Sequence, residues 1–356
     1  MTVDRLRRLR AAAQLLHRWE PRAPVEVVHR LLAVQAQDLR AAMLAVRARS
    51  RGATAADVAR ALTDDRSLVV TWLCRGTLHL VGRAEYPWLL GLTAPAQLTT
   101  SRRRLTEEGF PPDAADAAVT AIEGVLAEQG PLTRPAIVAA LAGRGIVAAG
   151  QAAPHLLRLA SLRGIVVQGP IVDGGHAFVL VRDWLGAPPA ALADRTATLA
   201  ELALRYLRGH GPASDADLAM WSGLPLRDVR AGLAAARDRI VDAGSGLVDV
   251  AGRDEDAGAG PPRLLPAFDP YLLGWRDRGV VVPEQRRRDV HPGGGMLRAV
   301  AIVDGIAIGT WSRPRGEIVI APFDAVEPGV EAALAVDAAD VLRFERLGFS
   351  RGLPVR

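Results

Sequence analysis

Apolar residues three and four positions apart recur in three similar stretches of the chain. Each stretch opens with a glycine and a turn, places a threonine or serine at a helix N-cap position, and continues as a short amphipathic helix. The stretches begin at Gly52, Gly130 and Gly211, so their starts are 78 and 81 residues apart. A period of that length fits a small domain that occurs three times, and it is too long for the unit of a solenoid.

The middle copy has the clearest pattern. It predicts three helices followed by two strands, at residues 115–128, 133–141, 151–163, 165–172 and 176–181. Thr133 is the expected N-cap of the second helix, and Asp173-Gly174-Gly175 is the expected turn between the strands. Three helices followed by a hairpin is the element order of a winged helix.

The other two copies follow this order more loosely. The third copy predicts three helices and a short wing, at residues 196–208, 214–222, 226–238 and 240–250. The first copy ends in its own strand pair, at residues 67–73 and 77–81, on either side of Arg75-Gly76.

After residue 262 the pattern changes from helical to β. Residues 251–262 are rich in Gly, Asp and Pro and indicate a linker. Strands are predicted beyond it at residues 299–303, 306–311, 317–321 and 341–346, and a helix at residues 332–340. The Asp304-Gly305 pair between two apolar runs is the strongest short hairpin signal in the chain.

These patterns predict a mainly helical chain with β-structure (α+β) in four domains. We expect three tandem winged-helix domains at residues 1–110, 111–190 and 191–252, and a C-terminal β-rich domain at residues 263–356. The composition of 49% apolar and 23% charged residues is typical of a soluble globular protein, and the length of 356 residues alone suggests two to three domains. A disordered or fibrous chain is excluded.

The sequence contains few residues that could hold a metal or form a disulfide. Cys74 is the only cysteine, which excludes an internal disulfide and agrees with a reducing compartment. No i, i+4 histidine pair, carboxylate triad or cofactor fingerprint is present, so neither a metal nor another cofactor is expected. The first 21 residues do not form a signal peptide, and no stretch approaches the ~18 apolar residues of a membrane span. We therefore expect a cytoplasmic protein without a membrane partner.

All 44 basic residues are arginines, against 39 acidic residues. Residues 1–110 hold 18 arginines and 10 acidic residues, and residues 263–315 hold 9 and 5. Two basic segments suggest two surfaces that face one polyanion such as nucleic acid, although arginines scattered over a solvated face would give the same counts. Without lysine, the chain has no side chain for a Schiff base. A G+C-rich genome is the favoured explanation for the absence of lysine, because the codons of Arg, Ala, Gly and Pro are then abundant together.

Winged helices usually place their third helix in the major groove of DNA, but they also act as dimerisation or docking modules. In the middle copy this helix offers Arg158 and Arg163, which suit phosphate contacts better than base reading. A DNA-binding regulator is the ordinary use of such modules.

Four segments, at residues 31–40, 72–81, 264–278 and 300–311, resemble the bacterial winged-helix DNA glycosylases of the AlkZ and YcaQ kind. The likeness extends over nearly the whole chain. It implies a C-shaped arrangement of three winged helices with DNA in the concave channel. The catalytic motif of the family is Gln-x-Gln in the AlkZ branch and Gln-x-Asp in the YcaQ branch, and Gln35-Ala36-Gln37 has the AlkZ form.

The resemblance implies a monofunctional DNA glycosylase that hydrolyses the N-glycosidic bond of N-alkylated purines. Bulky N7-alkylguanine adducts and interstrand crosslinks from a DNA-alkylating natural product are the implied lesions, in DNA repair or antibiotic self-resistance. The expected partner is double-stranded DNA with such lesions, bound by a monomer at the nucleoid. A non-catalytic regulator or architectural protein and a docking module are the alternatives, and the intact motif favours the enzyme.

Two glutamines can support hydrolysis of this glycosidic bond. An N7-alkylguanine already carries a positive charge, so catalysis needs a water placed near C1′ and a stabilised oxocarbenium-like sugar. Amides can orient that water without titrating, but cannot act as a general base. Residues i and i+2 share a face only in extended backbone, so Gln35 and Gln37 converge if the helix that begins near Pro24 ends by Val34. Otherwise they solvate a frayed helix end.

Two further groups are expected to contact DNA: Arg75, Thr77 and His79, which alternate along one predicted strand, and Trp275, Arg276 and Arg278, which follow a turn at Gly274. For His79 a structural role is an equal alternative. Phe268, Tyr271 and Leu272 are assigned to the core. Since the family uses a hairpin in its C-terminal domain, the Asp304-Gly305 tip is expected to probe the minor groove.

Overall fold

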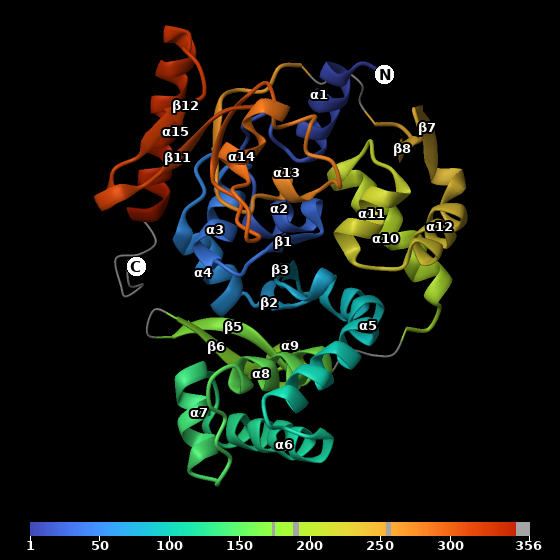
Figure 1. The fold of residues 1–356 in the computed structure, drawn as a ribbon, viewed down its shortest axis with the longest axis vertical. Helices are drawn as coiled ribbons and strands as arrows, with labels where there is room; N and C mark the ends of the chain where they lie inside the picture. Colours follow the sequence, from blue (N-terminus) through green and yellow to red (C-terminus); the bar gives the residue numbers. More distant parts are fainter. Residues whose placement is uncertain (173–174, 188–191, 254–257, 347–356) are drawn as a thin grey trace. The chain divides into compact units, whose positions relative to one another are not determined.

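The computed structural model describes residues 1–172, 175–187, 192–253 and 258–346. These residues pack as two compact units (Figure 1). The first unit combines Met1–Asp57 with the described part of Thr196–Gly348, and the second is Val58–Arg195. The first unit is therefore discontinuous in sequence, with the second inserted into it. The division into four domains stays a prediction.

The second unit contains the element order predicted for the middle copy. Its elements are the end of α4 (Ala55–Thr63), β2 (Leu68–Trp72), η1 (Cys74–Gly76), β3 (Leu78–Gly82), α5 (Tyr86–Glu107), α6 (Pro112–Gln129), β4 (Leu132–Thr133), α7 (Arg134–Ala142), α8 (Ala152–Leu162), β5 (Val166–Val172), β6 (Gly175–Leu180) and α9 (Val181–Leu185). Five of its strands are antiparallel in the order β3-β2-β5-β6-β4. The residues Asp173 and Gly174 of the predicted turn lie outside the described residues.

Helical spacing explains how α6, α7 and α8 pack. The buried residues of α6 recur three and four positions apart and include Ala115, Ala118, Val119, Ile122 and Leu126. They form one apolar core with Ile137 and Leu141 of α7 and with Leu156 and Leu159 of α8. Thr133 occupies the N-cap position of α7, as predicted.

The N-terminal part of the first unit contains α1 (Val3–Ala13), α2 (Pro24–Leu31), β1 (Ala33–Gln35) and α3 (Leu39–Arg47). After the second unit the chain forms α10 (Arg195–His210), α11 (Asp215–Ser222), α12 (Leu226–Ala235), η2 (Arg237–Arg239), β7 (Ile240–Gly244) and β8 (Leu247–Val250). This is the order of helices and wing predicted for the third copy. Ser214 caps α11 by accepting a hydrogen bond from the backbone N–H of Asp217 at 3.1 Å.

The C-terminal part contains β9 (Arg263–Leu265), α13 (Pro270–Leu273), η3 (Glu284–Arg286), α14 (Arg287–Val290), β10 (Val300–Val303), β11 (Ile306–Ser312), η4 (Pro314–Gly316), β12 (Val319–Pro322) and α15 (Pro328–Arg346). The strands pair in the order β12-β11-β10-β9. The strand predicted at residues 341–346 is wrong, because these residues end α15. Within residues 341–346 the buried positions are Val341, Phe344 and Glu345, which are three and four residues apart, as on one face of a helix.

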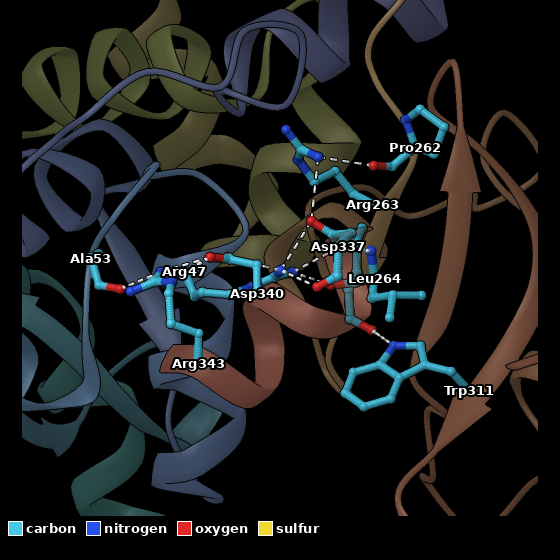
Figure 2. A network of polar contacts seen from close by, with 10 residues as sticks. Arg47, Ala53, Pro262, Arg263, Leu264, Trp311, Asp337, Asp340 and Arg343 are labelled. Atoms are coloured by element: carbon cyan, nitrogen blue, oxygen red, sulfur yellow. Dashed lines mark hydrogen bonds and ion pairs between the residues drawn. The ribbon is translucent and has the colours of Figure 1, made fainter. Parts of the chain in front are cut away.

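A buried ionic network joins α3, β9 and α15 (Figure 2). Arg47 Nη1 lies 3.0 Å from Asp337 Oδ1, and neither side chain has exposed surface. Arg47 Nη2 donates to the carbonyl oxygen of Leu264 at 2.8 Å, and Arg263 Nη1 lies 3.3 Å from the same Asp337 oxygen. Arg343 Nη2 donates to the carbonyl oxygen of Ala53 at 2.9 Å. These contacts link the N-terminal and C-terminal parts of the first unit.

Candidate active site

The Gln35-Ala36-Gln37 motif lies in the short connection between α2 and α3. Helix α2 ends at Leu31, and Leu32 leaves the helical conformation with φ 68° and ψ −46°. Strand β1 then ends at Gln35, and α3 begins at Leu39. The helix therefore ends before Val34, which was the condition for the two glutamines to converge.

The two glutamine side chains contact each other. Gln35 Nε2 donates a hydrogen bond to Gln37 Oε1 at 3.1 Å. Ala36 is buried, whereas Gln35 is half-buried and Gln37 is exposed. Ala36 thus lies in the core, and both amides lie on the accessible side. The predicted convergence is confirmed, and the catalytic role stays a prediction.

Buried and capping residues fix the backbone on both sides of the motif. Leu31, Leu32 and Val34 have no exposed surface. After the motif, Asp38 Oδ1 accepts a hydrogen bond from the backbone N–H of Ala41 at 3.1 Å and so caps α3. The glutamine pair is therefore held between two anchored segments.

The contact uses only part of the hydrogen-bonding capacity of the pair. Within the described ranges, Gln35 Oε1 and Gln37 Nε2 have no protein partner. The pair therefore presents an acceptor and a donor side by side, which is what two amides need to hold one water molecule. Because amides do not titrate, the pair can orient that water and cannot take its proton.

An exposed turn with two arginines belongs to the same unit. It joins β11 to β12 at η4, where Arg315 is exposed and has φ 52°. The buried carboxylate of Glu345 is ion-paired with Arg313 at the base of this turn and accepts a hydrogen bond from Arg40 Nε of α3 at 2.5 Å. The turn is thus connected to the helix that follows the glutamine motif.

The predicted alternation of Arg75, Thr77 and His79 along one strand is wrong. Arg75 lies in η1 with φ 57°, Thr77 precedes β3, and only His79 belongs to that strand. The tight turn at Arg75-Gly76 interrupts the extended backbone that alternation requires. His79 is buried, its Nδ1 lies 2.9 Å from the carbonyl oxygen of Thr77, and burial lowers its pKa to about 3. These features fit the structural alternative for His79.

Arg158 and Arg163 lie at α8 as predicted, and each has a partner in the second unit. Arg158 is half-buried, its Nη2 donates to Gln97 Oε1 at 3.4 Å, and burial lowers the pKa of its guanidinium. Arg163 is ion-paired with Asp116, and its hydrogen bond lowers the pKa of that carboxyl. Their contact with DNA stays a prediction.

The segment after Gly274 is divided between core and surface. Trp275 is 2% exposed, its Nε1 donates to the carbonyl oxygen of His210 at 2.9 Å, and the guanidinium carbon of Arg10 lies 4.5 Å from the ring centroid. A side chain so enclosed cannot track a DNA backbone, so that expectation for Trp275 is corrected. Arg276 is exposed and Arg278 is half-buried. For these two arginines, DNA contact stays a prediction.

The core assignments in the same segment are mostly confirmed. Tyr271 and Leu272 are buried, whereas Phe268 is half-buried and has φ 57°.

The Asp304-Gly305 hairpin exists, but its tip is partly covered. Val303 pairs with Ile306 as the turn predicts. Arg7 Nε and Arg8 Nε of α1 donate to the carbonyl oxygen and to Oδ2 of Asp304, both at 3.1 Å, and Tyr271 donates to the carbonyl oxygen of Gly305 at 3.1 Å. These contacts leave Asp304 only partly accessible, and the minor-groove role of the tip stays a prediction.

The exposed turn at η4 was not singled out from the sequence. Its signal is the run Arg313-Pro314-Arg315-Gly316, in which proline and glycine favour a turn and the arginines supply positive charge.

The described residues form neither a metal site nor a membrane span. No group of three or more His, Cys, Asp or Glu side chains there is placed to hold a metal ion. Nor is any helix in those ranges long and apolar enough to cross a membrane.

Comparison with known proteins gives one consistent set of matches. The family model described as DNA glycosylase AlkZ-like matches residues 28–344. A curated protein of Streptomyces sahachiroi, named interstrand DNA cross-link repair glycosylase, is 31% identical in an alignment of 353 positions that covers 93% of this chain and 92% of that protein. The solved structure of Streptomyces sahachiroi DNA glycosylase AlkZ has a TM-score of 0.80 and 26% identity, with 100% of this chain and 99% of that chain covered. The family match includes all four segments that carried the resemblance.

Proposed function

Because the chain belongs to the AlkZ-like DNA glycosylase family and is a DNA glycosylase, we propose that it releases N-alkylated purines from double-stranded DNA with Gln35 and Gln37 as catalytic residues. Bulky N7-alkylguanine adducts are the favoured substrates. The name of the Streptomyces sahachiroi relative supports the extension to interstrand crosslinks. The corresponding role is repair, or self-resistance to a DNA-alkylating natural product, by a cytoplasmic monomer at the nucleoid.

One observation carries the proposal: the amides of Gln35 and Gln37 meet at 3.1 Å on the accessible side of an anchored connection. This arrangement leaves one acceptor and one donor for a water molecule and the substrate. An unanchored pair at a frayed helix end would not keep the two groups together.

The reaction replaces the alkylated base at C1′ by water. The C1′–N9 bond breaks and its electron pair goes to the base, which leaves as neutral 7-alkylguanine because N7 already carries positive charge. The water oxygen bonds to C1′ and its proton passes to bulk solvent. Gln35 Oε1 accepts a hydrogen bond from the water and directs a lone pair toward C1′, while Gln37 fixes the Gln35 amide. Holding the water in place lowers the entropic part of the barrier.

Arginines on the surface supply the DNA contacts in this proposal. Arg75, Arg276 and Arg315 are exposed, and guanidinium groups pair well with phosphate oxygens. Arg278, Thr77 and the two α8 arginines are the other contacts expected from the sequence, and Arg315 is added because it is exposed in the structure. Such contacts are not sequence-specific, which suits an enzyme that recognises damage.

The test is release of 7-methylguanine from a methylated duplex. The Gln35→Ala/Gln37→Ala variant should lose roughly 100-fold or more in rate, since removal of positioned hydrogen-bonding groups has effects of this size. Gln285→Ala, an exposed glutamine of η3, is the matched control and should keep the wild-type rate. The product strand should stay unbroken and borohydride should trap no adduct, because the chain has no lysine.

Equal release by the double variant and the control would refute the catalytic assignment. Binding of duplex DNA without release by any of the three proteins would support the non-catalytic alternative.

A further inference from the structure

A pocket with an excess of positive charge lies between α2 and α10 in the first unit. It has a volume of about 400 Å³, and its polar lining consists of Arg22, Arg30, Arg205, Arg208, His29 and Glu26. We propose that this pocket binds a phosphate group. The proposal is independent of the glycosylase chemistry assigned to the glutamine pair.

The packing of α10 on α2 builds the pocket. A Cβ atom at Gly209 would lie 2.4 Å from the carbonyl oxygen of Arg30, so only glycine allows α10 to approach α2 this closely. The approach places Arg208 beside Arg30. Arg205 is held in position, because its Nη2 donates to the carbonyl oxygen of His29 at 3.0 Å and lies 3.1 Å from His29 Nδ1. The guanidinium groups are therefore gathered by the fold.

Arg22 is also anchored. Its Nη1 donates to the carbonyl oxygen of Arg49 at 2.9 Å, and its Nη2 lies 2.8 Å from Glu20 Oε2. The guanidinium group of Arg22 is thus held by Arg49 and Glu20 where it borders the pocket.

Two of the four arginines have carboxylate partners, Arg22 with Glu20 at 2.8 Å and Arg205 with Glu201 at 3.8 Å, but the described residues hold no carboxylate partner for Arg30 or Arg208. Arg30 Nε is buried and has no hydrogen-bond partner within those residues. Burial lowers the pKa of Arg30, and the nearby charges of Arg253, Arg22 and Arg208 lower it further. Among the residues that line the pocket, Glu26 is the single carboxylate, and its Oε2 accepts a hydrogen bond from the backbone N–H of Ala23 at 2.7 Å. A buried donor without an acceptor is energetically unfavourable, so an anionic ligand that supplies an acceptor in the pocket would stabilise the protein.

Phosphate is the anion that matches this set of donors. Its oxygens can accept hydrogen bonds from several guanidinium groups at once, and paired bonds between arginine and phosphate are among the strongest in proteins. The group can come from the DNA backbone or from free phosphate. Both sources use the same donors, and experiment separates them.

The first experiment measures thermal stability of the full-length protein with inorganic phosphate against chloride of equal ionic strength. Phosphate should raise the melting temperature of the wild type. Arg30→Gln should weaken the apparent phosphate affinity at least tenfold, and without phosphate it should melt no lower than the wild type because repulsion is relieved. Arg208→Gln, at an exposed position, repeats the test if the first variant folds poorly. Arg288→Gln, an exposed arginine of α14, is the charge-matched control.

The second experiment measures binding of an undamaged duplex over a range of salt concentrations. If a DNA phosphate occupies the pocket, the slope of log affinity against log salt should shrink by about 0.9 in Arg30→Gln relative to Arg288→Gln, and inorganic phosphate should compete with the duplex. If free phosphate is the ligand, the two slopes should agree while phosphate binding is lost only in the pocket variants. Equal phosphate responses and equal slopes in all four proteins would overturn the proposal.

Discussion

At the scale of single residues, the glutamine pair and His79 show what spacing can and cannot reveal. Gln35 and Gln37 converge because α2 ends at Leu31, so that neither glutamine lies in a helix. The predicted alternation failed for Arg75, because a residue with positive φ interrupts the strand. The alternation rule holds only where the backbone is extended, and it was applied to Arg75 although the sequence itself indicated a turn at Arg75-Gly76.

Burial of His79 should make stability depend on pH. Its pKa is lowered to about 3 by burial, from an ordinary value of 6.5. The unfolded chain takes up a proton below pH 6.5, whereas the folded protein does not until about pH 3. Neutral His79 therefore makes its full contribution to the free energy of unfolding above pH 6.5. As the pH falls from 6.5 toward 3, this contribution decreases by up to about 1.4 kcal/mol per pH unit.

The measurement is the melting temperature between pH 8 and pH 5. His79→Gln should show a shallower decrease than the wild type, with part of the decrease retained because burial also lowers the pKa of His176, to about 4. Parallel curves for the two proteins would contradict the assignment.

At the scale of elements, the site depends on where helices end. The sequence showed that α2 must stop early for the motif to work, and it predicted the helices of the second and third copies closely. It did not distinguish strand from helix at residues 341–346, because six residues are too few to separate alternation from a spacing of three and four. In the structure these residues belong to the long helix α15, in which Val341 and Phe344 are buried on one face.

The N-cap of α3 should matter more for activity than for stability. Asp38→Ala removes the hydrogen bond to the backbone of Ala41 and should reduce stability by about 1 kcal/mol. It should also lower the glycosylase rate, because the cap fixes the backbone directly after Gln37. Ser214→Ala removes an N-cap hydrogen bond of the same length, 3.1 Å, in α11 and is the matched control. It should lose a similar amount of stability and keep the wild-type rate. Asp38→Asn should restore both properties.

Stability and rate are read from urea denaturation and 7-methylguanine release. If the Asp38→Ala and Ser214→Ala proteins release the base equally fast, Asp38 has no positioning role.

At the scale of the whole molecule, charge counting overestimated the DNA-facing surface. The 18 arginines of residues 1–110 include Arg47 and Arg49, which are fully buried against Asp337 and Asp269. These partners lie more than 200 residues away in sequence, and no local pattern connects them. For the same reason the sequence could not show that α1 partly covers the Asp304-Gly305 tip.

Loss of the charge on Asp337 should destabilise the first unit strongly. Asp337→Asn leaves Arg47 and Arg263 without their shared carboxylate in a buried site, which should reduce stability by about 3–5 kcal/mol. Asp238→Asn, from an exposed pair with Arg237, should change it by less than about 0.5 kcal/mol. Urea denaturation of both variants checks this, and coinciding midpoints would show that the network contributes little.

The insertion of the second unit into the first also sets an order of events during biosynthesis. Arg47 and Asp337 are separated by 290 residues, which a ribosome adding about 5–20 residues per second needs roughly 15–60 s to translate. During that interval the N-terminal helices have emerged without their carboxylate partners, whereas Val58–Arg195 already contains its own apolar core. We therefore expect the inserted unit to fold before the Arg47–Asp337 ion pair, which can form only after α15 has been synthesised.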